Sequence, residues 1–238
     1  MGSEQSKNRK QRHVSWIHWI WYEIFRTSLW VMMQICFRVW HYGRRNVPWK
    51  GATLLVANHQ SFLDPVAVGI GVWRRMNYLA RKTLFKFKPF GWMIHSVDAI
   101  PLDQEGIGFA GIKETLRRLK NEEAVLIFPE GSRCPDGKIE PFLEGYITLA
   151  FRSKATIVPV AVVGAFDVFP RGQKFPNFFK RPICIEYGTP IRFEEYGSLS
   201  EQEVHQMVEQ RIRTMFDARM KKRGQFKEDP AAKTEDPS

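Results

Sequence analysis

A histidine and an aspartate five residues apart follow an apolar run in the first third of the chain. The run at residues 52–57 predicts a buried strand, and His59 and Asp64 lie in the segment that leaves it. Loops at strand ends carry most α/β functional sites. A carboxylate on one imidazole nitrogen fixes the tautomer, so the other nitrogen can take a proton from a hydroxyl. Asp64 directly precedes Pro65, a pattern typical of a helix start. Considered without other motifs, Asp64 could therefore be only a helix cap and His59 only a loop residue.

A second polar group follows another apolar run, at residues 124–128. Its sequence is FPEGSR at 128–133. Gly131 permits a tight turn with close backbone approach to a ligand, and the planar guanidinium of Arg133 suits a phosphate. Glu130 could orient a substrate hydroxyl or hold the arginine. A turn carrying an ordinary surface ion pair is the competing interpretation.

The apolar runs predict the scaffold that must position these two segments. Further strands are expected at residues 77–80, 99–102, 156–163 and 183–187, the last at a sheet edge. Helices fit between them, most clearly at residues 107–120. Alternating strands and helices favour a single α/β domain with a mixed sheet flanked by helices.

The remaining segments surround a core expected at residues 43–197. We expect a basic tail at 1–12, an aromatic interfacial helical segment at 13–42, a helix at 198–222 and a disordered tail at 223–238. Ser200 and Glu203 fit a capping box at the start of the last helix.

Charge and aromatic content narrow the class of partner. The 238 residues contain 36 Lys and Arg against 25 acids, a net charge of +11, and five of the eight Trp lie between 16 and 40. Such a chain should seek polyanions, and tryptophan beside basic residues is typical of membrane interfaces. No nucleic-acid module is recognisable, so nucleic acid is not expected as a partner.

The segment at 13–42 predicts how the chain meets a membrane. Charged residues interrupt it, so no uncharged run reaches the roughly 20 residues of a spanning helix. We expect an amphipathic segment in the interface of an anionic membrane, monotopic or peripheral, at the cytoplasmic face. A helical hairpin packed on a soluble domain is the alternative. Three widely spaced cysteines indicate a reducing compartment, and neither they nor the histidines have zinc spacing, so no metal is expected.

Taken together, these blocks resemble the PlsC-type glycerolipid acyltransferases, the family of 1-acyl-sn-glycerol-3-phosphate acyltransferases. The resemblance covers roughly residues 40–195 and rests on NHQSFLD at 58–64 and FPEGSR at 128–133. Two weaker matches are AIPLDQ at 99–104 and IVPVAV at 157–162. The order and separation of the blocks also fit the family.

The resemblance implies a role for each residue of the two blocks. His59 would be the general base and Asp64 its orienting partner. The residues that would bind the acceptor are Glu130, Gly131, Ser132 and Arg133. The implied reaction moves an acyl chain from acyl-CoA or acyl carrier protein, as substrate rather than cofactor, to the free hydroxyl of 1-acylglycerol-3-phosphate, giving phosphatidate. Ser61 is a poorly placed nucleophile, so no acyl-enzyme is expected.

Two departures from the family pattern bear on the acceptor. Gln104 stands where the family usually carries an arginine that helps bind phosphate, and Glu144 occupies a region where many relatives have a lysine. Basic residues of the acid-free stretch 65–97 could compensate, and Lys82 is assigned to substrate binding on that ground. Alternatively, the acceptor is a different lysolipid. A third hypothesis is a catalytically silent peripheral lipid-binding protein.

Overall fold

The structure is a computed structural model that describes residues 16–81, 100–102, 109–178 and 182–224. Within these ranges one sheet comprises strands β1 (Trp40–Tyr42), β2 (Thr53–Ala57), β3 (Met76–Arg81), β4 (Ile100–Leu102), β5 (Ala124–Ile127), β6 (Thr156–Val163) and β7 (Cys184–Tyr187). Their order across the sheet is β1-β7-β6-β2-β5-β3-β4. Every neighbouring pair is parallel except β6 with β7. The predicted α/β domain with a mixed sheet is therefore confirmed.

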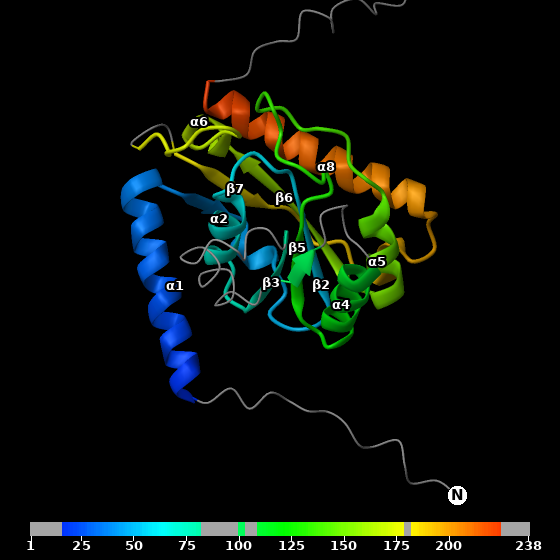
Figure 1. The fold of residues 1–238 in the computed structure, drawn as a ribbon. Helices are drawn as coiled ribbons and strands as arrows, with labels where there is room; N and C mark the ends of the chain where they lie inside the picture. The colour runs from blue at the N-terminus through cyan, green and yellow to red at the C-terminus, as the bar shows by residue number, and fades with distance from the viewer. Residues whose placement is uncertain (1–15, 82–99, 103–108, 179–181, 225–238) are drawn as a thin grey trace, which may run out of the picture.

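Helices cover both faces of this sheet (Figure 1). They are α1 (Trp16–Phe37), α2 (Asp64–Ile70), α4 (Phe109–Lys120), α5 (Gly145–Ser153), α6 (Ala165–Val168), α7 (Phe193–Tyr196) and α8 (Glu201–Lys222), with a 3-10 turn η1 (Arg44–Asn46). Side chains alternate along β2, so Leu55 packs in the cluster with α1 and α2, whereas Leu54 and Val56 pack with α4, α5 and α8. Burial on both faces explains why β2 is apolar throughout.

Two expectations about the sheet edge are wrong. Residues 183–187 do not form an edge strand, because β1 pairs with the outer side of β7 through Trp40 with Cys184 and Tyr42 with Glu186. The aromatic segment expected to be helical over 13–42 is helical in the structure only up to Phe37. Arg38 then adopts a positive φ of 48°, which ends the helix, and the chain enters β1.

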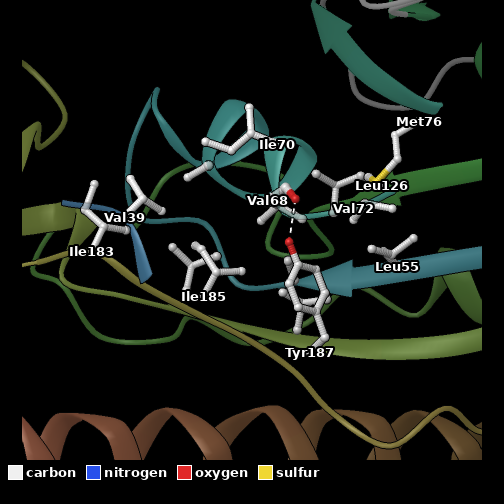
Figure 2. Close-up of a cluster of buried hydrophobic side chains, with 14 of the residues drawn as sticks. Val39, Leu55, Val68, Ile70, Val72, Met76, Leu126, Ile183, Ile185 and Tyr187 are labelled. Atoms are coloured by element: carbon white, nitrogen blue, oxygen red, sulfur yellow. Dashed lines mark hydrogen bonds between the residues drawn. The ribbon is translucent and has the colours of Figure 1, made fainter. Parts of the chain in front are cut away.

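Helix α2 is held at its carboxyl end by three side chains from other elements. Tyr187 donates its hydroxyl hydrogen to the Val68 carbonyl at 2.5 Å, a bond drawn in Figure 2 among the surrounding apolar side chains. His41 Nε2 donates to Ala67 O at 2.8 Å, and Arg44 Nε donates to Gly71 O at 2.7 Å. These bonds engage carbonyls in the last turn of α2 and at Gly71 directly after it, where backbone partners within a helix run out. They also fix the position of Asp64 at the other end of the same helix.

The terminal segments are only partly within the described ranges. Ser200 Oγ accepts from Glu203 N at 3.2 Å, and the Glu203 carboxylate accepts from Ser200 N at 2.8 Å, so α8 begins with the expected capping box. The basic tail at 1–12 and nearly all of the tail at 223–238 lie outside these ranges. Among the helices that the structure describes, none combines the length and apolarity needed to cross a bilayer.

Candidate active site

His59 and Asp64 are in direct contact at the carboxyl end of β2. His59 Nδ1 lies 2.8 Å from Asp64 Oδ2, and because a carboxylate only accepts, Nδ1 carries the proton in this contact. The same oxygen accepts from Gln60 N at 2.6 Å and Ser61 N at 2.7 Å. The carboxylate of Asp64 therefore organises the loop before α2 rather than capping the helix, and Leu63 occupies the cap position.

The imidazole of His59 is clamped but not enclosed. Its ring stacks on Phe128 with centroids 4.1 Å apart, and its side chain keeps 18% of its surface exposed. The carbonyl of His59 accepts from Cys134 N at 2.8 Å. With Nδ1 committed to the carboxylate, neutral His59 has an unprotonated Nε2 that can accept a proton. This is the geometry that a general base needs.

Glu130 joins the two sequence blocks through the backbone. Its Oε1 accepts from His59 N at 2.7 Å and its Oε2 accepts from Glu140 N at 3.2 Å. Both oxygens of this nearly buried carboxylate are thus engaged by backbone N–H groups. In this arrangement the side chain braces the backbone of His59, whereas the expected role of Glu130 in binding the acceptor stays a prediction.

Burial dominates the electrostatics of Glu130. It raises the pKa of this carboxyl from 4.5 to about 7, the carboxylates of Asp64 and Glu140 raise it further, and the two backbone N–H bonds oppose the shift. Ionised Glu130 therefore costs folding free energy, and its bonds from two backbone N–H donors offset part of that cost.

The difference in free energy of unfolding between wild type and Glu130→Gln is expected to depend on pH. Since the folded-state pKa is raised, the folded protein retains a proton that the unfolded chain has released, and stability from this group falls as pH rises from 4.5 to about 7. Across that range the wild type should lose at most about 3 kcal/mol relative to the variant. Urea unfolding at constant ionic strength measures the difference, with Glu194→Gln on the surface of α7 as control. A pH-independent difference would contradict the assignment.

The turn after β5 places Arg133 against the first block. Gly131 has φ +69°, a conformation that favours glycine, and its N–H donates to Phe128 O at 3.1 Å. The guanidinium carbon of Arg133 lies 3.4 Å from the ring centroid of Phe62. Gly131 and Ser132 are exposed at this turn. The turn therefore presents a cation and accessible backbone beside the loop that carries His59.

Other nucleophile candidates near the dyad are committed elsewhere. The hydroxyl of buried Ser61 donates to Phe169 O at 2.8 Å and accepts from Leu63 N at 3.2 Å. That it forms no acyl-enzyme stays a prediction. Burial raises the pKa of the Cys134 thiol to about 12, so it carries almost no thiolate at neutral pH. Lys82 and Gln104 lie outside the described residues.

A metal site has no support in the part of the chain that the structure describes, because no three His, Cys, Asp or Glu side chains cluster there. The histidines outside the dyad that it describes in detail have packing roles. His41 is tied to Ala67 O, and His205 lies 3.4 Å from Glu209.

Asn58 is a positioning residue that the sequence analysis missed. Its Oδ1 accepts from Val162 N at 2.7 Å and its Nδ2 donates to Val162 O at 2.9 Å. The carboxamide thus continues the pairing of β2 with β6 by one step beyond Ala57 and fixes where His59 leaves the sheet. A buried amide directly after an apolar strand was the available signal, because such a group must find hydrogen-bond partners.

Comparisons with known proteins show which family the chain resembles in sequence and fold. The acyltransferase family model matches residues 38–163. The 1-acyl-sn-glycerol-3-phosphate acyltransferase of Bacillus subtilis is 28% identical over 183 residues, covering 76% of this chain and 88% of its own length. The Saccharomyces cerevisiae protein of the same name is 32% identical over 186 residues, covering 70% of this chain and 57% of its own length.

A solved structure shares the fold. The crystal structure of the 1-acyl-sn-glycerophosphate acyltransferase PlsC from Thermotoga maritima superposes with a TM-score of 0.69 at 24% identity, covering 82% of this chain and 77% of that one. Both sequence blocks, at 58–64 and 128–133, lie inside the matched family region. The chain therefore belongs to the acyltransferase family, of the PlsC type.

Proposed function

We propose that this enzyme moves an acyl chain from a thioester donor, acyl-CoA or acyl carrier protein, to the free hydroxyl of 1-acylglycerol-3-phosphate, giving phosphatidate. The contact between His59 Nδ1 and Asp64 Oδ2 carries the proposal, because it leaves Nε2 as a base on an accessible ring. The names of the relatives from Bacillus subtilis and Saccharomyces cerevisiae support the acceptor.

The reaction requires one proton to be held during the transfer. Nε2 of His59 takes the proton of the acceptor hydroxyl while that oxygen attacks the thioester carbonyl, so that a C–O bond forms. The C–S bond then breaks, and the leaving thiolate takes the proton from the imidazolium. Asp64 stabilises the imidazolium between these steps because its carboxylate faces Nδ1. No covalent acyl-enzyme is involved.

Arg133 is the proposed binding residue for the acceptor phosphate. Its guanidinium is held over Phe62, two residues before Asp64, at the side of the site formed by the turn at 130–133. A planar guanidinium can bind two phosphate oxygens at once. Binding the phosphate there would bring the free hydroxyl of a glycerol backbone into the neighbourhood of the loop that carries His59.

The outer face of α1 supports membrane association. Ile24, Val31 and Ile35 lie on one side of this helix and are exposed, whereas Met33 and Phe37 on the opposite side are buried against the domain. An exposed apolar helix face suits the interface of a bilayer, where the lysophospholipid acceptor resides. We propose that the enzyme is peripheral or monotopic at the cytoplasmic face, with α1 lying in one leaflet's interface.

A donor-by-acceptor activity matrix with purified protein tests the proposed function. Turnover is expected to be highest for 1-acylglycerol-3-phosphate, with lower rates for lysophosphatidylcholine and for monoacylglycerol. Arg133→Ala should raise KM for the phosphate-bearing acceptor by roughly ten- to a hundredfold, because a charge-assisted hydrogen bond is lost. It should have little effect on monoacylglycerol.

Arg152→Ala, which removes an exposed arginine on α5, is the control for that variant. A clear preference for an acceptor without a phosphomonoester would favour the alternative lysolipid. Absence of turnover with every pair would favour a silent lipid-binding protein.

A further inference from the structure

Four exposed tryptophans form a continuous surface beside the edge of the sheet. Trp30, on α1, and Trp40, on β1, are 41% and 51% exposed and line one shallow groove of about 580 Å³ together with Arg44. The guanidinium carbon of Arg44 lies 4.2 Å from the ring centroid of Trp73, which is 53% exposed. Trp73 stacks on Trp49, 68% exposed, at 6.3 Å. We call these four tryptophans and Arg44 the tryptophan–arginine surface.

The sequence segment that supplies Trp30, Trp40, Arg44 and Trp49 carries basic residues and no acidic ones. Arg45 and Lys50 are exposed next to Arg44 and Trp49, and no acidic residue occurs in the sequence between Glu23 and Asp64. Exposed cations without interleaved acids attract anionic partners. The indole ring adds an apolar body with one N–H donor, a combination that suits the depth of lipid headgroups.

The surface is built into the folded domain. Arg44 is anchored by its Nε–H bond to Gly71 O, at the carboxyl end of α2, and the same guanidinium lies over the ring of Trp73. Asp64 lies at the opposite end of α2, so the surface is separate from the catalytic dyad. Rigid aromatic groups lose little conformational freedom on binding, so a surface made of them is a preformed binding site.

We propose that the tryptophan–arginine surface is a second membrane contact, which lies in the headgroup region of an anionic bilayer. The inference rests on the membrane association proposed above and adds to it a contact on the domain itself. The outer face of α1 supplies apolar anchoring, whereas this surface supplies aromatic and cationic contact at shallower depth. Two contacts, the outer face of α1 and the tryptophan–arginine surface, fix how the domain is oriented relative to the bilayer.

Vesicle sedimentation of the full-length protein tests the proposal. The Trp49→Ala/Trp73→Ala variant is expected to bind vesicles of phosphatidylcholine with phosphatidylglycerol roughly tenfold or more weakly than wild type. Ile112→Ala/Phe175→Ala removes two exposed apolar side chains elsewhere and should bind like wild type. Arg45→Gln/Lys50→Gln should lose roughly tenfold on these anionic vesicles and almost nothing on phosphatidylcholine alone.

The outcomes separate this surface from the catalytic proposal. Vesicle binding by the tryptophan variant equal to that of the Ile112/Phe175 control overturns the second contact. Unchanged binding by the charge variant, which replaces two exposed side chains, overturns it too. Sedimentation velocity supplies a further check, since tryptophan-dependent self-association would make the surface a dimer contact instead. Acyl transfer to lysolipid in detergent micelles is measured in parallel. That assay tests the proposed catalytic function and does not depend on vesicle binding.

Discussion

Replacement of His59 by alanine is expected to lower kcat for acyl transfer by roughly 10²–10⁴-fold, the usual contribution of a positioned general base. The acceptor hydroxyl is a weak nucleophile at neutral pH, and Nε2 of His59 is the basic atom that the loop after β2 leaves accessible. KM for the acceptor should change little, because phosphate binding is assigned to Arg133. Initial rates with acyl-CoA and 1-acylglycerol-3-phosphate measure both constants.

The matched control for His59→Ala is His205→Ala. His205 is a mostly buried imidazole whose Nε2 lies 3.4 Å from Glu209 on α8, so its removal costs packing and this contact without touching the dyad. It should retain kcat within a fewfold of wild type. Full activity of His59→Ala would show that another group accepts the proton, and the mechanism proposed above would be wrong.

Asp64→Asn is expected to lower both activity and stability. Three N–H donors converge on Oδ2, whereas Oδ1 is buried without a hydrogen-bond partner among the described residues. An asparagine that keeps its oxygen at the Oδ2 position therefore buries an NH₂ group with no acceptor, at a cost of about 1–3 kcal/mol. The imidazolium also loses its counter-charge, so kcat should fall by roughly 10²–10⁴-fold.

Denaturant unfolding and initial rates separate the two consequences of Asp64→Asn. The activities of wild type and variant are compared at one temperature, well below the unfolding midpoint of the variant. A loss in kcat is then separated from a loss of folded protein. If the folded variant turned over at a rate close to that of wild type, the carboxylate would have only a structural role in ordering the loop.

The contact between His59 and Asp64 could be predicted from sequence because it is local. The loop between the end of the buried strand and the helix marked by Pro65 is short. It therefore keeps the side chains of His59 and Asp64 close together. The long apolar strands were found for a similar reason: β6 runs over Thr156–Val163 as expected, since burial on both faces produces an uninterrupted apolar run.

Features that depend on distant partners could not be predicted in this way. Strand β1 is three residues at the end of an aromatic segment, and only pairing with β7, more than 140 positions later, makes it a strand. The role of Glu130 likewise depends on the parallel register of β2 with β5, which sets Val56 beside Ile127. That register brings the carboxylate of Glu130 to the backbone N–H of His59. Every residue except proline has such an N–H group, so the residue types in the sequence do not indicate this partner.

Strand β2 has β5 on one side and β6 on the other, and both neighbours are themselves flanked by further strands. Cooperative units at the centre of a sheet open only when most of the molecule opens, whereas margins fray readily. His59, the proposed proton acceptor, therefore follows the part of the sheet that is hardest to open, and its loop is tied to β5 and β6 through Glu130 and Asn58. Lipids with acyl chains of different length, or with different headgroups, must be accommodated by other segments. In this architecture, evolution can therefore vary the selectivity for lipids while the position of His59 stays fixed.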